Sequence, residues 1–213
     1  MNLHASDRSL RTKRLFDIVG ALVGLTVAAP VMLVVAALVA IKLGRPVLFR
    51  QSRPGLGQRP FDVLKFRSMQ EIDEAKGLVT DEQRLTRFGK ILRSTSLDEL
   101  PSLINILRGE MSFVGPRPTL ERYLDLYTEH ERRRYEVLPG LTGLAQVRGR
   151  NELPWPERLR SDVEYVERRS LGLDFRIMLR TVVVVLRREG INAPGHVSAD
   201  EFQGTAQMEP ANA

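Results

Sequence analysis

Two adjacent carboxylates, Asp98 and Glu99, are the residues of this sequence whose types and placement best suit chemistry. They stand at the start of an expected short helix, and Arg93 precedes them in the same segment. A helix dipole and nearby arginines keep a carboxylate ionised at a helix N-terminus, where free backbone N–H groups can also meet phosphate oxygens. An ionised Asp98 in this position is competent as a nucleophile or as a magnesium ligand at neutral pH.

The basic residues of the same part of the chain could bind phosphate. Arg117 stands between two prolines, so its backbone has little freedom, which suits a guanidinium that grips phosphate in one geometry. Lys65 and Arg67 lie on one face of an expected strand and could add positive charge. Together with Arg93, these side chains describe a site for a diphosphate.

A helix start is a purely structural explanation of the two carboxylates. Ser96 and Glu99 fit a capping box, and Asp98 with Pro101 fits an alternative start two residues later. The residues alone leave this alternative open.

Composition limits the other chemistries. The 213 residues include no cysteine, so thiolate nucleophiles, disulfides and cysteine-ligated metals are excluded, and the three histidines are too dispersed for a metal site or a catalytic triad. A formal net charge of +6 predicts a phosphate-rich partner or an anionic lipid surface. Nucleic acid is not expected as a partner, because only the charge favours it and no recognition motif is present. Catalysis is therefore expected to use carboxylates.

The segment 18–41 is predicted to enter a membrane. Its 24 residues carry no charge, and a straight helix of that length would cover roughly 36 Å. Pro30 lies in the middle of the segment and should break or kink the helix. Basic residues flank both ends, and positive charge is normally retained on the cytoplasmic side. These features favour a re-entrant hairpin that enters and leaves the same leaflet; a kinked spanning helix is the alternative.

The remaining elements predict an α+β fold that is mostly helical. The expected organisation is a membrane-embedded re-entrant helix at 1–45, a compact cytosolic catalytic domain at 46–189 and a flexible C-terminal tail at 190–213. The domain is expected to contain a β-hairpin (46–49 with 61–66), helices at 80–92, 97–107, 120–137, 157–169 and 174–188, and a glycine-rich loop at 139–149.

The last of these helices is amphipathic. Arginines lie on its polar side, and its apolar face consists of Phe175, Met178, Leu179, Val182 and Leu186. This pattern is typical of a helix in a membrane interface, and equally of a helix that packs its apolar face in a core.

Seven short motifs cover most of the chain: Lys13-Arg-Leu-Phe-Asp17, Gln51-Ser-Arg-Pro-Gly55, Lys65-Phe-Arg-Ser-Met69, Phe88-Gly-Lys90, Ser96-Leu-Asp-Glu-Leu100, Met111-Ser-Phe-Val-Gly-Pro-Arg-Pro118 and Pro139-Gly-Leu-Thr-Gly-Leu-Ala-Gln146. These motifs resemble those of the small monotopic phosphoglycosyl transferases, a family of bacterial sugar transferases, and in particular its bacillosamine-type members.

The resemblance implies a two-step transfer at the cytoplasmic face of the bacterial inner membrane. A monotopic enzyme of this kind moves a sugar 1-phosphate from a UDP-sugar to undecaprenyl phosphate and releases UMP. Asp98 would attack the β-phosphate to form an aspartyl phosphosugar, Glu99 would assist, and Mg²⁺ would bridge Asp98 and the diphosphate. By the same resemblance, the substrate-binding residues are Lys65, Arg93, Arg117 and Asp162.

The sequence departs from the family pattern at one position, and several alternatives stay open. Many relatives have Ser before the helix-breaking proline, whereas Ala29 precedes Pro30 here, which affects the depth and angle of the hairpin. A non-enzymatic protein that binds anionic lipid surfaces is the main alternative function, and direct transfer without a covalent intermediate is the alternative mechanism. The segments 195–198 and 202–204 resemble those of bacillosamine-type enzymes and favour a diacetamido-trideoxy sugar, while galactose, N-acetylgalactosamine and related sugars remain open.

Overall fold

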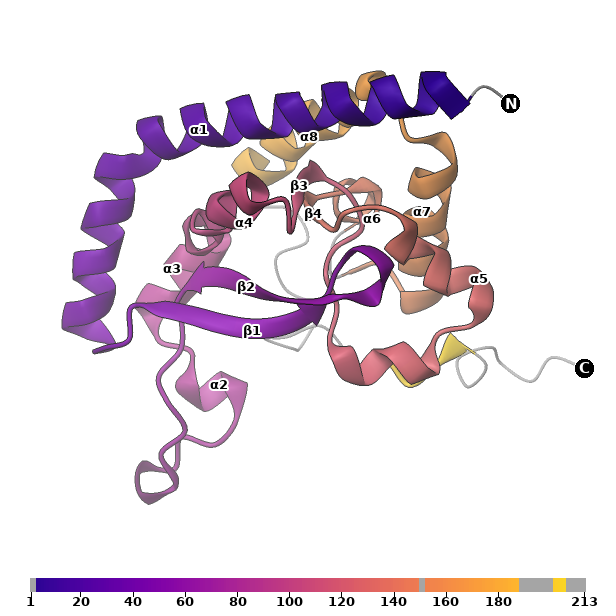
Figure 1. The fold of residues 1–213 in the computed structure, drawn as a ribbon. Coiled ribbons are helices and arrows are strands. Elements are labelled where there is room, and N and C mark those ends of the chain that lie inside the picture. Colours follow the sequence, from indigo (N-terminus) through magenta and orange to yellow (C-terminus); the bar gives the residue numbers. More distant parts are fainter. Residues whose placement is uncertain (1–2, 150–151, 188–200, 206–213) are drawn as a thin grey trace, which may run out of the picture.

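A computed structural model describes residues 3–149, 152–187 and 201–205 of the chain, with side chains from Leu10 onward (Figure 1). It confirms a mostly helical α+β fold with one long apolar N-terminal helix and a small two-stranded sheet. The helices are α1 (Leu3–Lys42), α2 (Asp81–Arg84), α3 (Arg87–Ser94), α4 (Ser102–Arg108), α5 (Glu129–Arg132), α6 (Leu144–Arg148), α7 (Trp155–Arg168) and α8 (Leu171–Arg187).

Two small sheets accompany these helices. Strands β1 (Leu48–Pro54) and β2 (Pro60–Phe66) form the expected antiparallel hairpin, in a register that places Phe49 opposite Lys65 and Arg53 opposite Phe61. Strands β3 (Ser112–Val114) and β4 (Gly140–Thr142) pair in parallel. Short 3-10 turns connect the elements: η1 (Leu56–Gln58), η2 (Glu74–Lys76), η3 (Leu97–Glu99), η4 (Glu121–Leu126) and η5 (Arg133–Glu136).

Four expected elements differ from those of the structure. The helix predicted at 97–107 is the 3-10 turn η3 followed by α4, which begins only at Ser102, with Pro101 at its N-cap. The helix predicted at 80–92 is divided into α2 and α3, because Leu85 is extended and the Thr86 side chain caps a second helix. The helix predicted at 120–137 is three short pieces, η4, α5 and η5, since Thr128 starts a new capping box in its middle. The loop predicted at 139–149 contains β4 and α6.

Helix α1 lies along one side of the domain and bends partway along its length (Figure 1). Pro30 lies inside the helix, and an interior proline is a known cause of a bend. The arm before the bend packs on α4 through Ala21, Leu103 and Ile106. The arm after the bend packs Val35 and Val39 against Phe66 of β2 and Leu92 of α3. Both arms of α1 therefore contact the same domain.

Polar contacts fix the first arm of α1. Arg14 donates to the carbonyls of Ile106 and Leu107 at the C-terminal end of α4, at 2.6 and 2.7 Å. Asp17 is buried and accepts hydrogen bonds from the Ser112 hydroxyl and the Phe113 backbone N–H. The opposite face of α1 is open: Leu15, Val19, Leu22, Val23, Val27, Leu33, Val34 and Ile41 are exposed.

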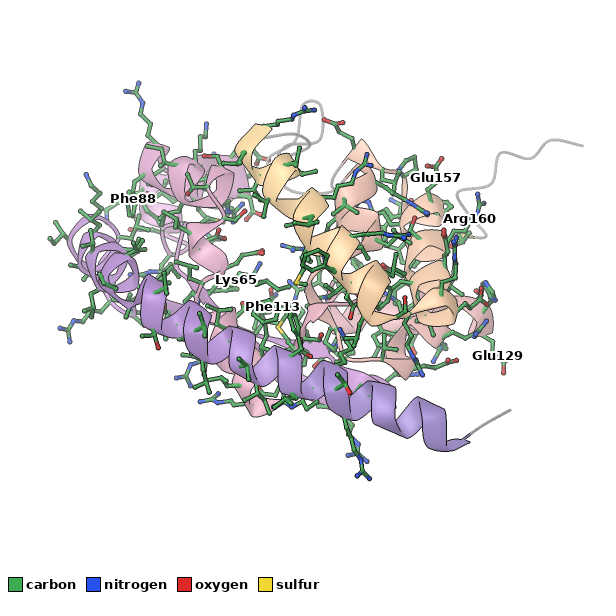
Figure 2. The ribbon with its side chains drawn as sticks, turned by 90° about the horizontal axis from the view of Figure 1, so that it is seen from above. Lys65, Phe88, Phe113, Glu129, Glu157 and Arg160 are labelled. Carbon is green, nitrogen blue, oxygen red and sulfur yellow. The ribbon has the colours of Figure 1, made fainter. Side chains whose placement is uncertain are left out.

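Helix α8 carries a second exposed apolar face. Ile177 and Val184 pack inward, whereas Phe175, Leu179, Val182 and Leu186 are all more than half exposed. The alternative in which these four side chains pack in the core is therefore wrong. Helices α1 and α8 lie on the same side of the molecule in both views (Figures 1 and 2).

Candidate active site

Asp98 and Glu99 lie in η3, the turn between α3 and α4. Ser96 begins this turn with φ +55° and makes no capping hydrogen bond with its side chain. The Glu99 carboxylate contacts Lys65 and Arg117 instead of the backbone N–H of Ser96. The capping-box explanation of this pair is therefore wrong, and the two carboxylates are available for another role.

Two cationic side chains contact the same oxygen of the Glu99 carboxylate. Lys65 Nζ lies 2.7 Å from Glu99 Oε1, and Arg117 Nη2 lies 2.5 Å from the same atom. Burial alone would raise the pKa of Glu99, but the charges of Arg117 and Lys65 hold that pKa well below its usual range. Glu99 is thus a permanent anion that keeps Lys65 and Arg117 side by side.

Asp98 has the opposite environment. Its side chain is buried, yet no described residue donates a hydrogen bond to its carboxylate or forms an ion pair with it. Burial, together with the charge of Glu99, raises the pKa of Asp98 to about 6, although Lys65, Arg93 and Arg117 oppose the rise. Most Asp98 side chains are therefore ionised at neutral pH, with oxygens that no described protein group occupies.

The contact between α4 and β2 explains why Lys65 reaches this site. The Ser102 hydroxyl donates to the carbonyl of Leu64 at 2.7 Å, and Asn105 accepts from the N–H of Leu64 at 3.0 Å. Asn105 also donates to the carbonyl of Asp62. Ser102 and Asn105 are almost completely buried, so these bonds are shielded from water and hold β2 against the helix that follows η3. Seen from above, Lys65 lies between α1 and α8 in projection (Figure 2).

The other two predicted basic residues have different roles. Arg93, in the last turn of α3, donates to the Ser68 hydroxyl at 3.0 Å and is close enough to Asp98 and Glu99 for their charges to act on it. Arg67 does not join the site, because its guanidinium bonds Glu71 and the carbonyl of Leu43 at the end of α1. Three cations, Lys65, Arg93 and Arg117, therefore surround the carboxylates.

Arg117 is fixed through its backbone. Gly115 and Gly140 pack so closely that a Cβ on Gly140 would lie 2.1 Å from the nitrogen of Gly115, so only glycine fits there. The Gly140 N–H donates to the carbonyl of Pro116 at 2.9 Å. Buried Arg134 donates to the carbonyl of Arg117 at 2.7 Å. The loop that carries Arg117 is therefore held on both sides.

Asp162 supports the loop that carries Arg117 through its ion pair with Arg134. It is buried and lies 2.7 Å from Arg134 Nη2, the same nitrogen that bonds the carbonyl of Arg117. Its role as a substrate-binding residue stays a prediction, because the structure connects it to the site only through Arg134. The sequence alone did not identify Arg134, because it is one of three consecutive arginines and nothing in their spacing distinguishes it.

The described residues contain no group of three or more histidine or carboxylate side chains that could hold a metal ion. Mg²⁺ needs fewer protein ligands, because it is commonly bound by one or two carboxylates together with substrate phosphates. The unpartnered Asp98 carboxylate fits that requirement, whereas Glu99 is already engaged by Lys65 and Arg117.

Comparison with known proteins identifies the family. Residues 8–188 match the bacterial sugar transferase family. The chain is 47% identical over 197 residues to the uncharacterized sugar transferase EpsL of Bacillus subtilis, which covers 92% of this chain and 98% of that protein. It is 41% identical over 186 residues to the UDP-glucose:undecaprenyl-phosphate glucose-1-phosphate transferase of Caulobacter vibrioides, over 82% of this chain and 69% of that protein. It is 40% identical over 205 residues to the UDP-galactose-lipid carrier transferase of Erwinia amylovora, over 87% of this chain and 43% of that protein. The family that the motifs indicated is thereby confirmed, and this chain belongs to the bacterial sugar transferases.

Proposed function

We propose that this protein transfers a sugar 1-phosphate from a UDP-sugar to undecaprenyl phosphate and releases UMP. One observation carries the proposal: a buried Asp98 carboxylate that has no partner among the described residues and is surrounded by Lys65, Arg93 and Arg117. Relatives named as transferases of glucose 1-phosphate to undecaprenyl phosphate support the same reaction class.

The environment of Asp98 favours a covalent route. In the first step, an Asp98 oxygen forms a bond to the β-phosphorus, the bond between that phosphorus and the bridging oxygen breaks, and UMP leaves with the electron pair. In the second step, a phosphate oxygen of undecaprenyl phosphate forms a bond to the same phosphorus, and the acyl phosphate bond breaks to restore the Asp98 carboxylate. Lys65, Arg93 and Arg117 stabilise the charge on the phosphoryl oxygens in both steps.

Asp98 is the residue that would hold Mg²⁺, together with the substrate diphosphate. When bound, the ion supplies a compact positive charge that neutralises phosphate oxygens. Glu99 keeps Lys65 and Arg117 in place during the reaction, since both cations bond its Oε1 atom.

The membrane topology belongs to the same proposal. Within the described residues, α1 is the one helix long and apolar enough to cross a membrane. We propose that it enters and leaves the cytoplasmic leaflet of the inner membrane, because both of its arms contact the same domain. Helix α8 lies on the same side of the molecule as α1 (Figure 1), and its exposed apolar face would rest in the membrane interface.

The sugar is proposed only as a class, a hexose derivative carried on UDP. The names of relatives support glucose and galactose. The preference for a diacetamido-trideoxy sugar depended partly on residues 195–198, which lie outside the described residues. From the rest of that tail segment, Phe202 is buried and contacts Tyr123, Tyr127 and Trp155.

The decisive experiment measures UMP release by the detergent-purified protein with Mg²⁺, undecaprenyl phosphate and a panel of UDP-sugars. We expect release with one sugar class that depends on the lipid acceptor, and covalent labelling of the protein when the sugar phosphate is radioactive and the acceptor is omitted. Asp98→Asn should abolish both signals, while Asp125→Asn, at an exposed aspartate, should leave them unchanged.

Two results would contradict the proposal. If the wild-type protein released no UMP from any UDP-sugar of the panel, the result would favour the alternative in which the protein only binds lipid surfaces. Transfer by Asp98→Asn near the wild-type rate would rule out a nucleophilic Asp98.

A further inference from the structure

The motif Gln51-Ser-Arg-Pro-Gly55 contains a cation to which the reaction outlined above assigns no role. Arg53 lies on β1 and is half-buried. Its guanidinium donates to Gln51 Oε1 at 2.5 Å, and Gln51 is uncharged. No described carboxylate forms an ion pair with Arg53. A half-buried guanidinium without a counter-charge has lost part of its hydration, so an anion supplied from elsewhere would stabilise it.

The neighbours of Arg53 add to this positive charge. Burial and the charges of Arg117 and Arg122 lower the pKa of Arg53 to about 10, which places all three guanidinium groups within electrostatic reach of one another. Arg117 is compensated by Glu99, and Arg122 by Glu201. Arg53 is thus the member of this cluster whose charge no described residue balances.

The register of the hairpin places Arg53 on the same face as Lys65. Arg53 lies opposite Phe61, and side chains at alternate positions share a face, so Arg53, Gln51 and Lys65 all lie on one face of the hairpin. Lys65 lies four positions along β2 from Phe61, the partner of Arg53, which is about 13 Å along the strand. Pro54, next to Arg53, lines a small hollow together with Arg117. The cationic groups therefore continue from Lys65 through Arg117 to Arg53.

We propose that Arg53 binds a phosphate group that is not attacked by Asp98, and that Gln51 orients its guanidinium. This inference rests on the proposed function and extends its site along the β-hairpin. The phosphate could come from the UMP part of the UDP-sugar or from undecaprenyl phosphate. Both sources present the same chemistry, a phosphate oxygen that accepts hydrogen bonds from a planar guanidinium.

The test compares Arg53→Met with Arg50→Met in the full-length, detergent-purified protein. Arg50 is the matched control, because it is an exposed arginine of the same strand whose side chain lies on the opposite face of the hairpin. Three constants are measured for each variant: the Kd of UMP by calorimetry, the KM for the UDP-sugar and the KM for undecaprenyl phosphate. Arg53→Met should raise at least one of them about tenfold or more, since it removes a charge-assisted hydrogen bond, and Arg50→Met should raise none.

The three constants distinguish the two sources. A rise in the Kd of UMP and in the KM for the UDP-sugar assigns Arg53 to the nucleotide, whereas a rise confined to the KM for undecaprenyl phosphate assigns it to the lipid phosphate. Arg53→Lys keeps the positive charge but lacks the planar guanidinium, so it should recover part of the lost affinity. The same variant replaces Arg53→Met in the test if the methionine variant does not fold. Folded Arg53 variants that leave all three constants unchanged would overturn the inference.

Failure of the proposed function would give a separate result. If the wild-type protein released no UMP from any UDP-sugar, the titration with UMP would still report on Arg53. Weaker binding of UMP to Arg53→Met than to Arg50→Met would then support the anion site without the transferase reaction.

Discussion

Asp98 and Glu99 are neighbours in the sequence but have opposite electrostatic environments. Glu99 points toward Lys65 and Arg117, which hold its charge, while Asp98 is buried with no described hydrogen-bond donor at its carboxylate. The charge of Glu99 and burial both act to raise the pKa of Asp98. One carboxylate therefore organises the cations, and the other has no described donor at its oxygens, as the proposed nucleophile requires.

The raised pKa of Asp98 predicts an acid limit for the reaction. A nucleophilic carboxylate must be ionised, so kcat/KM for the UDP-sugar should be level above pH 7, fall to half near pH 6 and then fall about tenfold per pH unit. An aspartate with its ordinary pKa of 3.8 would keep its activity down to about pH 4. The measurement is a pH profile of initial UMP release, with thermal unfolding at each pH to show that the protein stays folded.

Glu99→Gln should move this acid limit in a known direction. The substitution removes the negative charge beside Asp98, so the pKa of Asp98 should fall and the half-maximal point should move to a lower pH than that of the wild type. The plateau rate should fall as well, because Lys65 and Arg117 lose their shared acceptor. A half-maximal point that stays fixed or moves to higher pH would show that a group other than Asp98 sets the limit.

Five of the six predicted catalytic and substrate-binding residues come together in the structure: Asp98, Glu99, Lys65, Arg93 and Arg117. They could be found because each stands in a short motif of distinctive chemistry. The support of Arg117 by Arg134 could not be found in the same way. It depends on contacts between residues 17 positions apart in the sequence, and on a 3-10 turn that makes Arg134 the buried member of its arginine run.

Among the elements, those with a strong local pattern were predictable. The β-hairpin, the long apolar helix and α7 follow from their own residues. The segment 120–137 has the charge and apolar spacing of one helix, but Tyr123, Tyr127 and Tyr135 turn into a common aromatic cluster with Phe202. Three short pieces present these rings to one core, which a straight helix would not do. Tertiary packing therefore overrides the local helical pattern.

Pro30 is the element-scale feature with the clearest test. Pro30→Leu restores the missing backbone N–H and removes the ring clash, so α1 should straighten toward a spanning helix. Single cysteines placed before and after the helix then report its topology through their accessibility to a membrane-impermeant reagent. We expect both sites to be cytoplasmic in the parent protein and one to become periplasmic in Pro30→Leu. If both stay cytoplasmic, the basic clusters rather than the proline determine the topology.

At the scale of the whole molecule, α1 is part of the domain that it anchors. Lys13 Nζ lies 2.6 Å from Asp174 of α8 and also donates to the carbonyl of Val114, three residues before Arg117. The Tyr165 hydroxyl of α7 lies between the same two residues, 2.7 Å from Asp174 Oδ1 and 3.0 Å from the carbonyl oxygen of Val114, and shares its single hydrogen between these two acceptors. Helix α1, helix α8 and the strand that leads to the Arg117 loop therefore meet at one polar junction.

This junction predicts a stability loss that surface ion pairs of the same chain should not show. Asp174 is 5% exposed in its side chain, so Lys13→Met leaves a buried carboxylate without its cation and should cost about 3 kcal/mol. For a chain of this size the loss corresponds to a melting temperature lower by about 6–12 °C.

The matched control is Arg168→Met, which breaks an exposed pair with Glu164 and should cost less than about 1 kcal/mol. The double variant Lys13→Met/Asp174→Asn should be more stable than Lys13→Met alone, because it removes the unpaired charge while the amide can still accept a hydrogen bond from Tyr165. Equal losses in Lys13→Met and Arg168→Met would mean that the junction does not hold α1 to the domain.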